Sequence, residues 1–363
     1  MIYRLYICSV IAWFAPYMLL GQTTLFVRAS GNDSNDGTSE STAKRTIAAA
    51  VAAANSEDII DVGEGTFAGA TISKSLLLQG ANANNALERW SAPTIVNSPL
   101  MLSDGAPGVV VTIVGLQFGA VVPIGGRCPN ANVTMYNCKF VGSKPLVTSQ
   151  SGWAELFLTA STFEAKVDAT KTGPAAATTA LVLGDVGVTV VRENTFRDFT
   201  KSAIDVSGTG QILRLSYNEF ANCNATKDQL HAAIRIDASG LEQEVTIENS
   251  LFTSCATSVS MSGTIAGKTI GVQRNSFRQT PAGSAAIRNL SPTSLDATCN
   301  AFNVPHKQKD KPLDAKLISE SVRRLLSGAV AFIPTNLDAT DTNGDSIGFE
   351  PDKERGCAAT FTE

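Results

Sequence analysis

Charged residues are scarce in this chain of 363 residues. They make up 17 % of the sequence, and 29 Lys and Arg residues against 33 Asp and Glu residues leave a formal net charge of −4. This mild acidity gives no electrostatic reason to expect nucleic acid or an anionic membrane surface as a partner. The hydrophobic fraction of 44 % argues against global disorder, because it supplies enough apolar surface for a folded core.

Apolar runs long enough to cross a bilayer are lacking after residue 21. Before it, Arg4 is followed by an uncharged, mostly apolar run from Leu5 to Leu20, and Gly21 follows that run. A basic start, a short apolar segment and a small residue at the exit are typical of a secretory signal peptide, which we predict for residues 1–21. The competing interpretation is a membrane anchor, for which the run is slightly short. We therefore expect a secreted or cell-surface protein whose mature chain has no membrane span.

Cysteine is also sparse, with seven residues in all. Removal of the signal peptide would take Cys8 and leave six, and an even number in an exported chain favours disulfides. Four Asn-x-Ser/Thr sequons begin at Asn32, Asn132, Asn224 and Asn289. They matter only where the secretory pathway attaches N-linked glycans, which the sequence does not specify.

The sequence does contain a long repeat. Phenylalanine recurs at spacings of 22, 23, 33, 24, 32, 25 and 25 residues, the two larger values being longer by about one loop. Of the sixteen residues five and seven places before each Phe, fifteen are apolar, and the residues between them are mixed and often polar. This alternation is typical of half-buried strands. The repeated residues are Phe118, Phe140, Phe163, Phe196, Phe220, Phe252, Phe277 and Phe302.

A second column, two places before the Phe, contains Asn194, Asn218, Asn275 and Asn300. Columns of like residues at a fixed phase are typical of a solenoid, in which each coil buries its apolar face against its neighbours. The repeat predicts an all-β, right-handed, single-stranded parallel β-helix over residues 22–305, and a β-sandwich with chance spacing is the competing interpretation. An Ala-rich helix at Thr46–Asn55 would cap the first coil, and residues 306–363 would form a C-terminal cap and tail with a helix at Leu313–Leu326.

The register of the coils also predicts disulfides. Cys223 and Cys255 each lie three residues after their Phe, so they should be about 4.8 Å apart on adjacent coils, and we expect them to be paired. Cys357 would then connect the tail to Cys299. Cys128 and Cys138 are the two cysteines that remain, and they would form the third disulfide.

A further strand follows the turn after each Phe, and its outward column contains Asp205, Arg235, Ser260 and Arg288. Asp205 and Arg235 should be neighbours, with Lys201, His231 and Asp237 near the same edge. The column is either an acid–base or sugar-binding cluster or an ordinary surface ion pair. Asp205, Arg235, Lys201 and His231 are therefore the catalytic candidates, and Asp205, Arg235 and Asp237 are candidates for glycan binding.

Two weaker candidates lie elsewhere. Trp153, like Trp90, could stack on a sugar ring or could close a loop. Asp341, Asn343 and Asp345 place oxygen atoms at alternate positions, as calcium loops do, although Ser346 and Asp352 depart from the EF-hand pattern and a plain polar loop is the competing interpretation. Calcium is thus the one cofactor that the sequence suggests.

The opening of the chain resembles secreted proteins of the pectin-lyase-like, right-handed β-helix superfamily. The resemblance rests on the motifs Phe26-Val-Arg-Ala-Ser-Gly-Asn-Asp-Ser-Asn-Asp-Gly-Thr38, Arg45–Val51, Asp58–Val62, Gly65–Phe67 and Lys74–Gly80. It implies the fold, but the superfamily includes polysaccharide lyases, hydrolases and non-catalytic surface proteins. The Asn-Thr-Asp, Asp-Asp and Gly-His-Gly motifs of pectinase-type hydrolases are absent, Phe196 follows Asn194-Thr195, and no acidic cluster typical of calcium-dependent lyases is present.

These observations favour a non-catalytic extracellular β-helix that binds an extracellular polysaccharide, a cell-surface glycan or another partner, or that serves as a surface scaffold. The alternative is an enzyme acting on an acidic polysaccharide, a lyase rather than a hydrolase.

Overall fold

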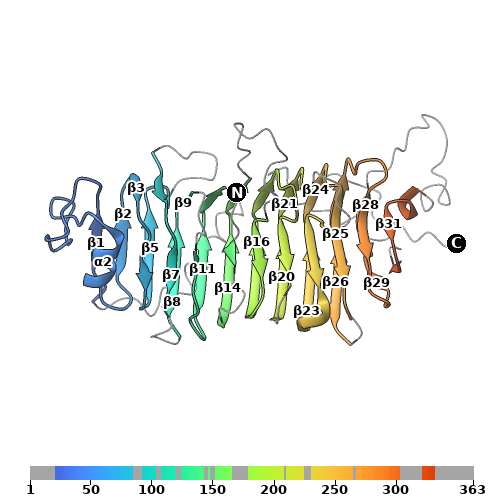
Figure 1. Ribbon diagram of the computed structural model, residues 1–363, viewed down its shortest axis with the longest axis horizontal. Coiled ribbons are helices and arrows are strands. Elements are labelled where there is room, and N and C mark those ends of the chain that lie inside the picture. The colour runs from blue at the N-terminus through green and yellow to red at the C-terminus, as the bar shows by residue number, and fades with distance from the viewer. Residues whose placement is uncertain are drawn as a thin grey trace, which may run out of the picture.

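The computed structural model describes residues 21–84, 92–103, 108–119, 124–142, 146–147, 152–165, 179–207, 210–224, 230–264, 267–302 and 321–331. Within them the chain winds into an elongated rod whose coils stack from the N-terminal to the C-terminal end (Figure 1). All strand pairs of the described residues are parallel, and each strand pairs with its equivalents in the coils before and after it. The structure is therefore the predicted right-handed parallel β-helix.

Three faces run along the rod. The first, sheet A, has twelve described strands: β1 (Thr24–Val27), β2 (Ile59–Val62), β5 (Leu76–Gly80), β8 (Val110–Val114), β11 (Asn132–Tyr136), β14 (Trp153–Thr159), β17 (Val186–Arg192), β20 (Gly210–Ser216), β23 (Leu241–Glu248), β26 (Thr269–Gln273), β29 (Leu295–Asp296) and β32 (Val330–Ala331).

Sheet B, which contains the Phe column, has ten described strands: β3 (Gly65–Phe67), β6 (Thr94–Val96), β9 (Leu116–Phe118), β12 (Lys139–Val141), β15 (Thr162–Glu164), β18 (Thr195–Arg197), β21 (Glu219–Ala221), β24 (Leu251–Thr253), β27 (Ser276–Arg278) and β30 (Ala301–Phe302).

The third face consists of two sheets. Sheet C contains β4 (Thr71–Ile72), β7 (Leu100–Leu102) and β10 (Ile124–Gly125). Sheet D contains β13 (Leu146–Val147), β16 (Leu181–Leu183), β19 (Ile204–Val206), β22 (Ile234–Asp237), β25 (Thr257–Ser262), β28 (Ala285–Asn289) and β31 (Leu326–Ser327).

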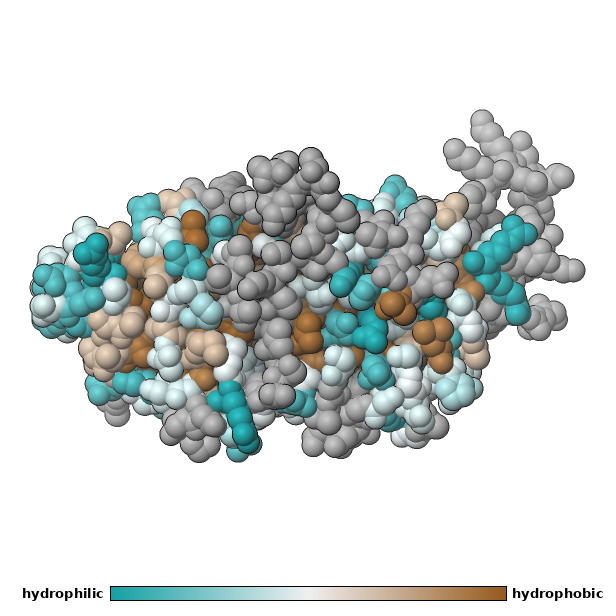
Figure 2. Space-filling view, viewed as in Figure 1, coloured by the Kyte–Doolittle hydropathy of each residue, from teal (hydrophilic) through white to brown (hydrophobic). Residues whose placement is uncertain are grey.

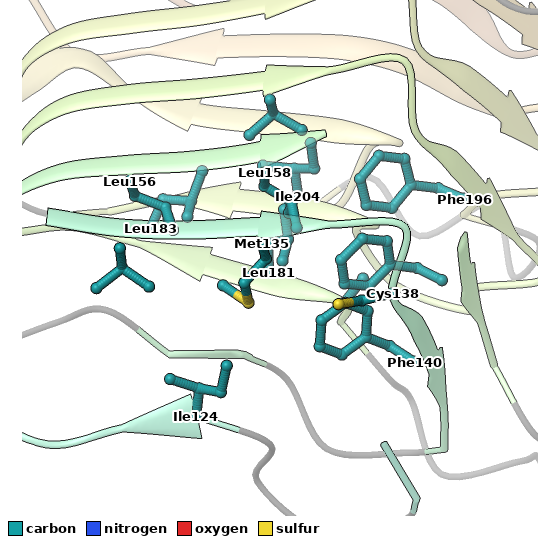
Figure 3. Close-up of a cluster of buried hydrophobic side chains, with 14 of the residues drawn as sticks. Ile124, Met135, Cys138, Phe140, Leu156, Leu158, Leu181, Leu183, Phe196 and Ile204 are labelled. Carbon is teal, nitrogen blue, oxygen red and sulfur yellow. The ribbon is translucent and has the colours of Figure 1, made fainter. Parts of the chain in front are cut away.

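The phenylalanines that defined the repeat form one continuous internal stack. From Phe118 to Phe302, successive ring centroids are 4.3–5.2 Å apart, with interplanar angles of 2–16°. Figure 3 shows the Phe140 and Phe196 rings in this column, in one buried cluster with Leu156 and Leu158 of sheet A and Leu181 of sheet D. The coil spacing of a parallel sheet brings the rings into face-to-face contact, so a single buried column joins the coils.

The Asn column is a hydrogen-bonded ladder. The backbone N–H of Ser161 donates to Asn194 Oδ1 at 2.9 Å, that of Asn194 to Asn218 Oδ1 at 3.0 Å, and that of Asn275 to Asn300 Oδ1 at 2.8 Å. Ser250 takes the place of Asn in one coil and accepts from the N–H of Asn218 at 3.2 Å. The ladder satisfies buried N–H groups that the turn removes from the sheets.

The turn from sheet A to sheet B requires a left-handed residue, which the sequence alone did not reveal. Three places before each Phe of the stack the backbone has positive φ, and a second set of such residues follows at the end of the sheet B strands. Ala160 and Glu193 adopt this conformation without the freedom of glycine, which costs about 1–2 kcal/mol for most residues. The first set is Gly115, Asn137, Ala160, Glu193, Tyr217, Asn249, Arg274 and Cys299.

The N-terminal end is closed as predicted. Helix α2 (Ile47–Ala53) buries Ile47, Ala50 and Val51, and Thr46 is its N-cap, accepting a hydrogen bond from the N–H of Ala49 at 3.1 Å.

At the other end β31 and β32 continue the sheets past the predicted boundary at residue 305, and residues 313–320 of the predicted helix lie outside the described residues. Leu326, predicted as helical, begins β31, and the described helical residues there are 321–323. The signal peptide prediction for residues 1–21 falls almost wholly outside the described residues. In the described part of the chain, no helix has the length and hydrophobicity needed to cross a membrane.

Candidate functional site

The outward column of sheet D is aligned as the sequence predicted. Asp205 pairs in register with Arg235, and the column continues through Ser260 and Arg288. Among the described residues it runs from Val147 to Ser327. Since each step is one strand spacing of about 4.8 Å, the column places polar side chains in a row along the rod.

Asp205 and Arg235 form an ion pair at the centre of this row. Arg235 Nη1 lies 2.8 Å from Asp205 Oδ1, and the two side chains retain 32 % and 18 % of their exposure. A short charge-assisted hydrogen bond between half-buried groups holds the guanidinium in place. Among the described residues no other hydrogen bond of Arg235 is found, so its remaining N–H donors could reach the hydroxyl or carboxylate groups of a ligand.

The two residues that follow in the row differ in exposure. Ser260 is 6 % exposed, which corrects the expectation that it faces solvent; a short side chain between two arginines in neighbouring coils has little free surface. Arg288 is half-buried, and its Nη2 donates to Thr257 Oγ1 at 3.2 Å. The row therefore presents two ordered guanidinium groups separated by one coil.

The other predicted members of the cluster have local partners. His231 Nδ1 lies 3.4 Å from Ser202 Oγ, and Asn224 Nδ2 donates to the His231 carbonyl at 2.9 Å. Lys201 is half-buried in the segment just before β19. The role of His231 as a proton carrier and that of Lys201 as a base stay predictions.

Asp237 lies on the outward side of β22, two residues after Arg235. Its Oδ1 accepts a hydrogen bond from the Ser239 N–H at 3.0 Å at the start of the short 3-10 helix η2 (Ala238–Gly240). This backbone hydrogen bond, followed by one from the Ser239 hydroxyl and by the charges of Arg235 and Lys268, lowers the pKa of Asp237. The carboxylate thus caps a turn and adds negative charge beside Arg235. Lys268, which the sequence analysis missed because no repeat position marks it, donates to the Ala238 carbonyl nearby.

Two of the connections between sheet B and sheet D are long and account for the longer repeats. The longer Phe spacings arise at residues 165–180 and 222–233, and each segment connects a sheet B strand to a sheet D strand. The turns from sheet A to sheet B, by contrast, are short, as at Asn137–Cys138 and Glu193–Asn194. Variation in connection length concentrates where a fold recognises its ligands, so sheet D is the better candidate face.

Trp153 is not available to a ligand. It is 1 % exposed at the start of β14 and belongs to the hydrophobic core, so the prediction that it stacks on a sugar is wrong. The strand alternation that places Leu156 and Leu158 inside would turn residue 153 outward, so the burial of Trp153 departs from that alternation at the start of β14. Trp90 lies outside the described residues.

The predicted disulfide between Cys223 and Cys255 is also wrong, and so is that between Cys128 and Cys138. All four are buried and none of them forms a disulfide. Cys223 Sγ lies 3.7 Å from the Phe196 carbonyl and Cys255 Sγ 3.6 Å from that of Phe220, each in the preceding coil. Side chains at equivalent places in stacked coils run parallel, so their Cβ atoms stay about 4.8 Å apart, farther than the ~3.8 Å typical of a disulfide.

Cys299 is not among the free thiols. Its predicted partner Cys357 lies outside the described residues, and that pair stays a prediction. Among the residues that the structure describes, no group of three or more His, Cys, Asp or Glu side chains could hold a metal ion. The calcium candidates Asp341, Asn343 and Asp345 lie outside this set.

The surface in view is polar with small separate apolar patches (Figure 2). The exposed large hydrophobic side chains of the described residues are Met101, Val110, Leu230 and Leu290.

Comparison with protein-family models matched residues 123–277 to the right-handed β-helix region. Comparisons with curated proteins and with solved structures found no match. The matched residues include the Asp205–Arg235 pair and six of the stacked phenylalanines, from Phe140 to Phe277.

Proposed function

Because the chain belongs to the superfamily of right-handed parallel β-helices, we propose that it is an extracellular β-helix that binds an extended glycan along sheet D without transforming it. The single observation that carries this proposal is the in-register polar row Asp205–Arg235–Ser260–Arg288. The row presents one polar side chain on each coil. Successive side chains of the row could therefore contact successive sugars of a linear polymer.

The donors in the row suit a glycan. Ordered guanidinium groups donate several N–H bonds in fixed directions, and they bind carboxylates as well as hydroxyl groups. The Asp205–Arg235 pair fixes one guanidinium, and the contact with Thr257 fixes that of Arg288. Less conformational freedom is then lost on binding.

A glycan array with the mature protein tests this proposal, with Arg235→Ala and Arg288→Ala as loss variants. The matched control is Arg214→Ala on sheet A, because Arg214 forms an exposed ion pair with Glu244 at 3.2 Å. We expect at least a tenfold loss of affinity in both sheet D variants and none in the control. Equal affinity in all four proteins, or no glycan bound at all, would overturn the proposal.

The alternative function is that of a lyase acting on an acidic polysaccharide. It is favoured by one observation, the presence of a carboxylate and a guanidinium 2.8 Å apart on one outward column. A lyase needs a group that removes the proton beside the uronate carboxylate and a cation that stabilises the developing charge. Lys201 lies just before β19, the strand that contains Asp205, and is the nearest candidate base in the sequence.

Release of unsaturated uronides from pectate, alginate and glycosaminoglycans, with and without calcium, distinguishes the two functions. Turnover that disappears in Arg235→Ala would establish the enzyme. Turnover that persists in both Asp205→Ala and Arg235→Ala would place the reaction elsewhere.

A further inference from the structure

The four sequons differ in how far their Asn side chains are exposed in the structure. Asn224 is 0 % exposed and Asn289 3 % exposed. Asn132 is half-buried within β11, between Val110 and Glu155 of the adjacent strands, and its Oδ1 is inaccessible. Asn32, by contrast, is exposed, as are Asp33 and Ser34, which complete its sequon.

The atom that N-glycosylation modifies is Nδ2, and the fold uses this atom at the two buried sites. Asn224 Nδ2 donates to the His231 carbonyl at 2.9 Å. Asn289 Nδ2 donates to the carbonyls of Thr293 at 2.8 Å and Ala329 at 2.6 Å. A glycan on either atom would disrupt these contacts and would have no space around it, so the folded protein cannot carry one there.

The side chain of Asn32 is exposed, and among the described residues its Nδ2 is not seen to donate a hydrogen bond to a backbone carbonyl. Its Oδ1 accepts a hydrogen bond from the N–H of Ser34 at 3.0 Å, an Asx turn that leaves Nδ2 on the exposed side. The backbone around it is fixed: the Asn32 N–H donates to the Ala43 carbonyl at 3.0 Å, and Lys44 Nζ donates to Asn35 O at 2.6 Å. The loop therefore holds the acceptor outward in a defined position.

The loop also lies at a place where a glycan is tolerated. Its residues cover the free edge of β1, since the Phe26 N–H donates to Gly37 O at 2.7 Å and the Lys44 N–H donates to Phe26 O at 2.9 Å. The loop that contains Asn32 is thus part of the cap over β1 at the blue N-terminal end of the rod in Figure 1, several coils before the sheet D row. A glycan there would extend from the end of the β-helix and leave its long faces open.

We infer that Asn32 is an N-glycosylation site of this protein and that Asn224 and Asn289 stay unmodified; the inference rests on the extracellular location in the proposed function. The donor is an oligosaccharide linked to a lipid through pyrophosphate. Asn32 Nδ2 forms a bond to the anomeric carbon of the first sugar, and the bond from that carbon to the pyrophosphate oxygen breaks. The lipid pyrophosphate leaves and takes up, overall, the proton that Nδ2 loses.

The test expresses the chain from residue 22 behind an added secretory leader in eukaryotic cells. Site occupancy is read by peptide mass spectrometry after enzymatic removal of N-glycans in ¹⁸O-water, for secreted and cell-retained protein alike. We expect occupancy at Asn32 and none at Asn224 or Asn289 in the secreted protein. Asn32→Gln and Ser34→Ala should each abolish the Asn32 signal, whereas Asn132→Gln, the matched control, should leave it unchanged.

Secreted protein with unmodified Asn32, or with a glycan on Asn224 or Asn289, would overturn the inference. The added leader makes this result independent of the native signal peptide. The Asn32→Gln protein should bind the same glycans on the array as the wild type, so failure of the sheet D proposal and failure of the Asn32 proposal are separate results.

Discussion

Asn218 Oδ1 accepts two hydrogen bonds from Asn194 in the preceding coil, one from its backbone N–H at 3.0 Å and one from its Nδ2 at 3.2 Å. Asn218 Nδ2 in turn donates to the Val191 carbonyl at 2.8 Å. One fully buried amide therefore bonds to two donors and one acceptor that belong to a different coil. This relationship, repeated along the rod, makes the stability of each coil depend on its neighbour.

We predict that Asn218→Ala lowers the free energy of unfolding by about 2–4 kcal/mol, because it leaves the Asn194 N–H and the Val191 carbonyl buried and without their present partner. Urea titration followed by circular dichroism measures the change. Gln273→Ala, which removes an exposed hydrogen bond to Asp296, is the control and should change stability by less than about 0.5 kcal/mol. A loss below about 1 kcal/mol in Asn218→Ala would show that water replaces the ladder.

Phe220 lies between the rings of Phe196 and Phe252, at centroid distances of 4.9 and 4.8 Å, and is 0 % exposed. Phe220→Ala should therefore destabilise the protein by about 3–5 kcal/mol, since it removes buried area and leaves a cavity in the column. Phe220→Leu should cost clearly less because it fills most of that space. Similar losses in both variants would mean that the stack itself, rather than the volume, is what matters.

The four buried thiols should not react with Ellman's reagent in the native protein and should react fully after unfolding in guanidinium. Burial raises the pKa of Cys223, so little of the reactive thiolate forms. Peptide mapping under non-reducing conditions should find Cys128, Cys138, Cys223 and Cys255 as thiols. The same map decides the predicted Cys299–Cys357 bond, and a linked peptide containing Cys223 and Cys255 would contradict the structure.

Cys138 also makes stability depend on pH. Burial raises its pKa from 9.0 to about 12. The folded state therefore binds more protons than the unfolded state between these two values, and the contribution of Cys138 to stability is fully present below pH 9 and is lost as the pH rises toward 12. Urea titrations at pH 8, 9 and 10 should show stability falling less steeply in Cys138→Ala than in the wild type. Parallel pH profiles of the two proteins would contradict this.

Ala160 has φ of 46°, a conformation that suits glycine better. Ala160→Gly should raise the free energy of unfolding by about 0.5–1 kcal/mol, because the left-handed conformation strains a residue with a Cβ atom. Ala154→Gly in β14, where the backbone is an ordinary strand, is the control and should lower it by a similar amount. Destabilisation in both variants would show that the strain at Ala160 is negligible.

The spacing of the phenylalanines, with the alternation before each of them, was enough to predict the fold and the alignment of Asp205 with Arg235. In a solenoid each residue meets its equivalent in the next coil, so a period read from the sequence is also a list of neighbours in space. The Asn ladder and the helix capped by Thr46 were predictable for the same reason, since their signals are local or periodic.

The tertiary structure alone decided how side chains are directed. A period gives the separation of the Cα atoms of Cys223 and Cys255 but not the direction of the Cβ atoms, which run parallel and leave both thiols free. Trp153 lies outside the repeated positions, so its burial depended on how β14 extends beyond the common strand length. Likewise the exposure that separates Asn32 from Asn224 comes from packing between coils, and a three-residue sequon contains no record of it.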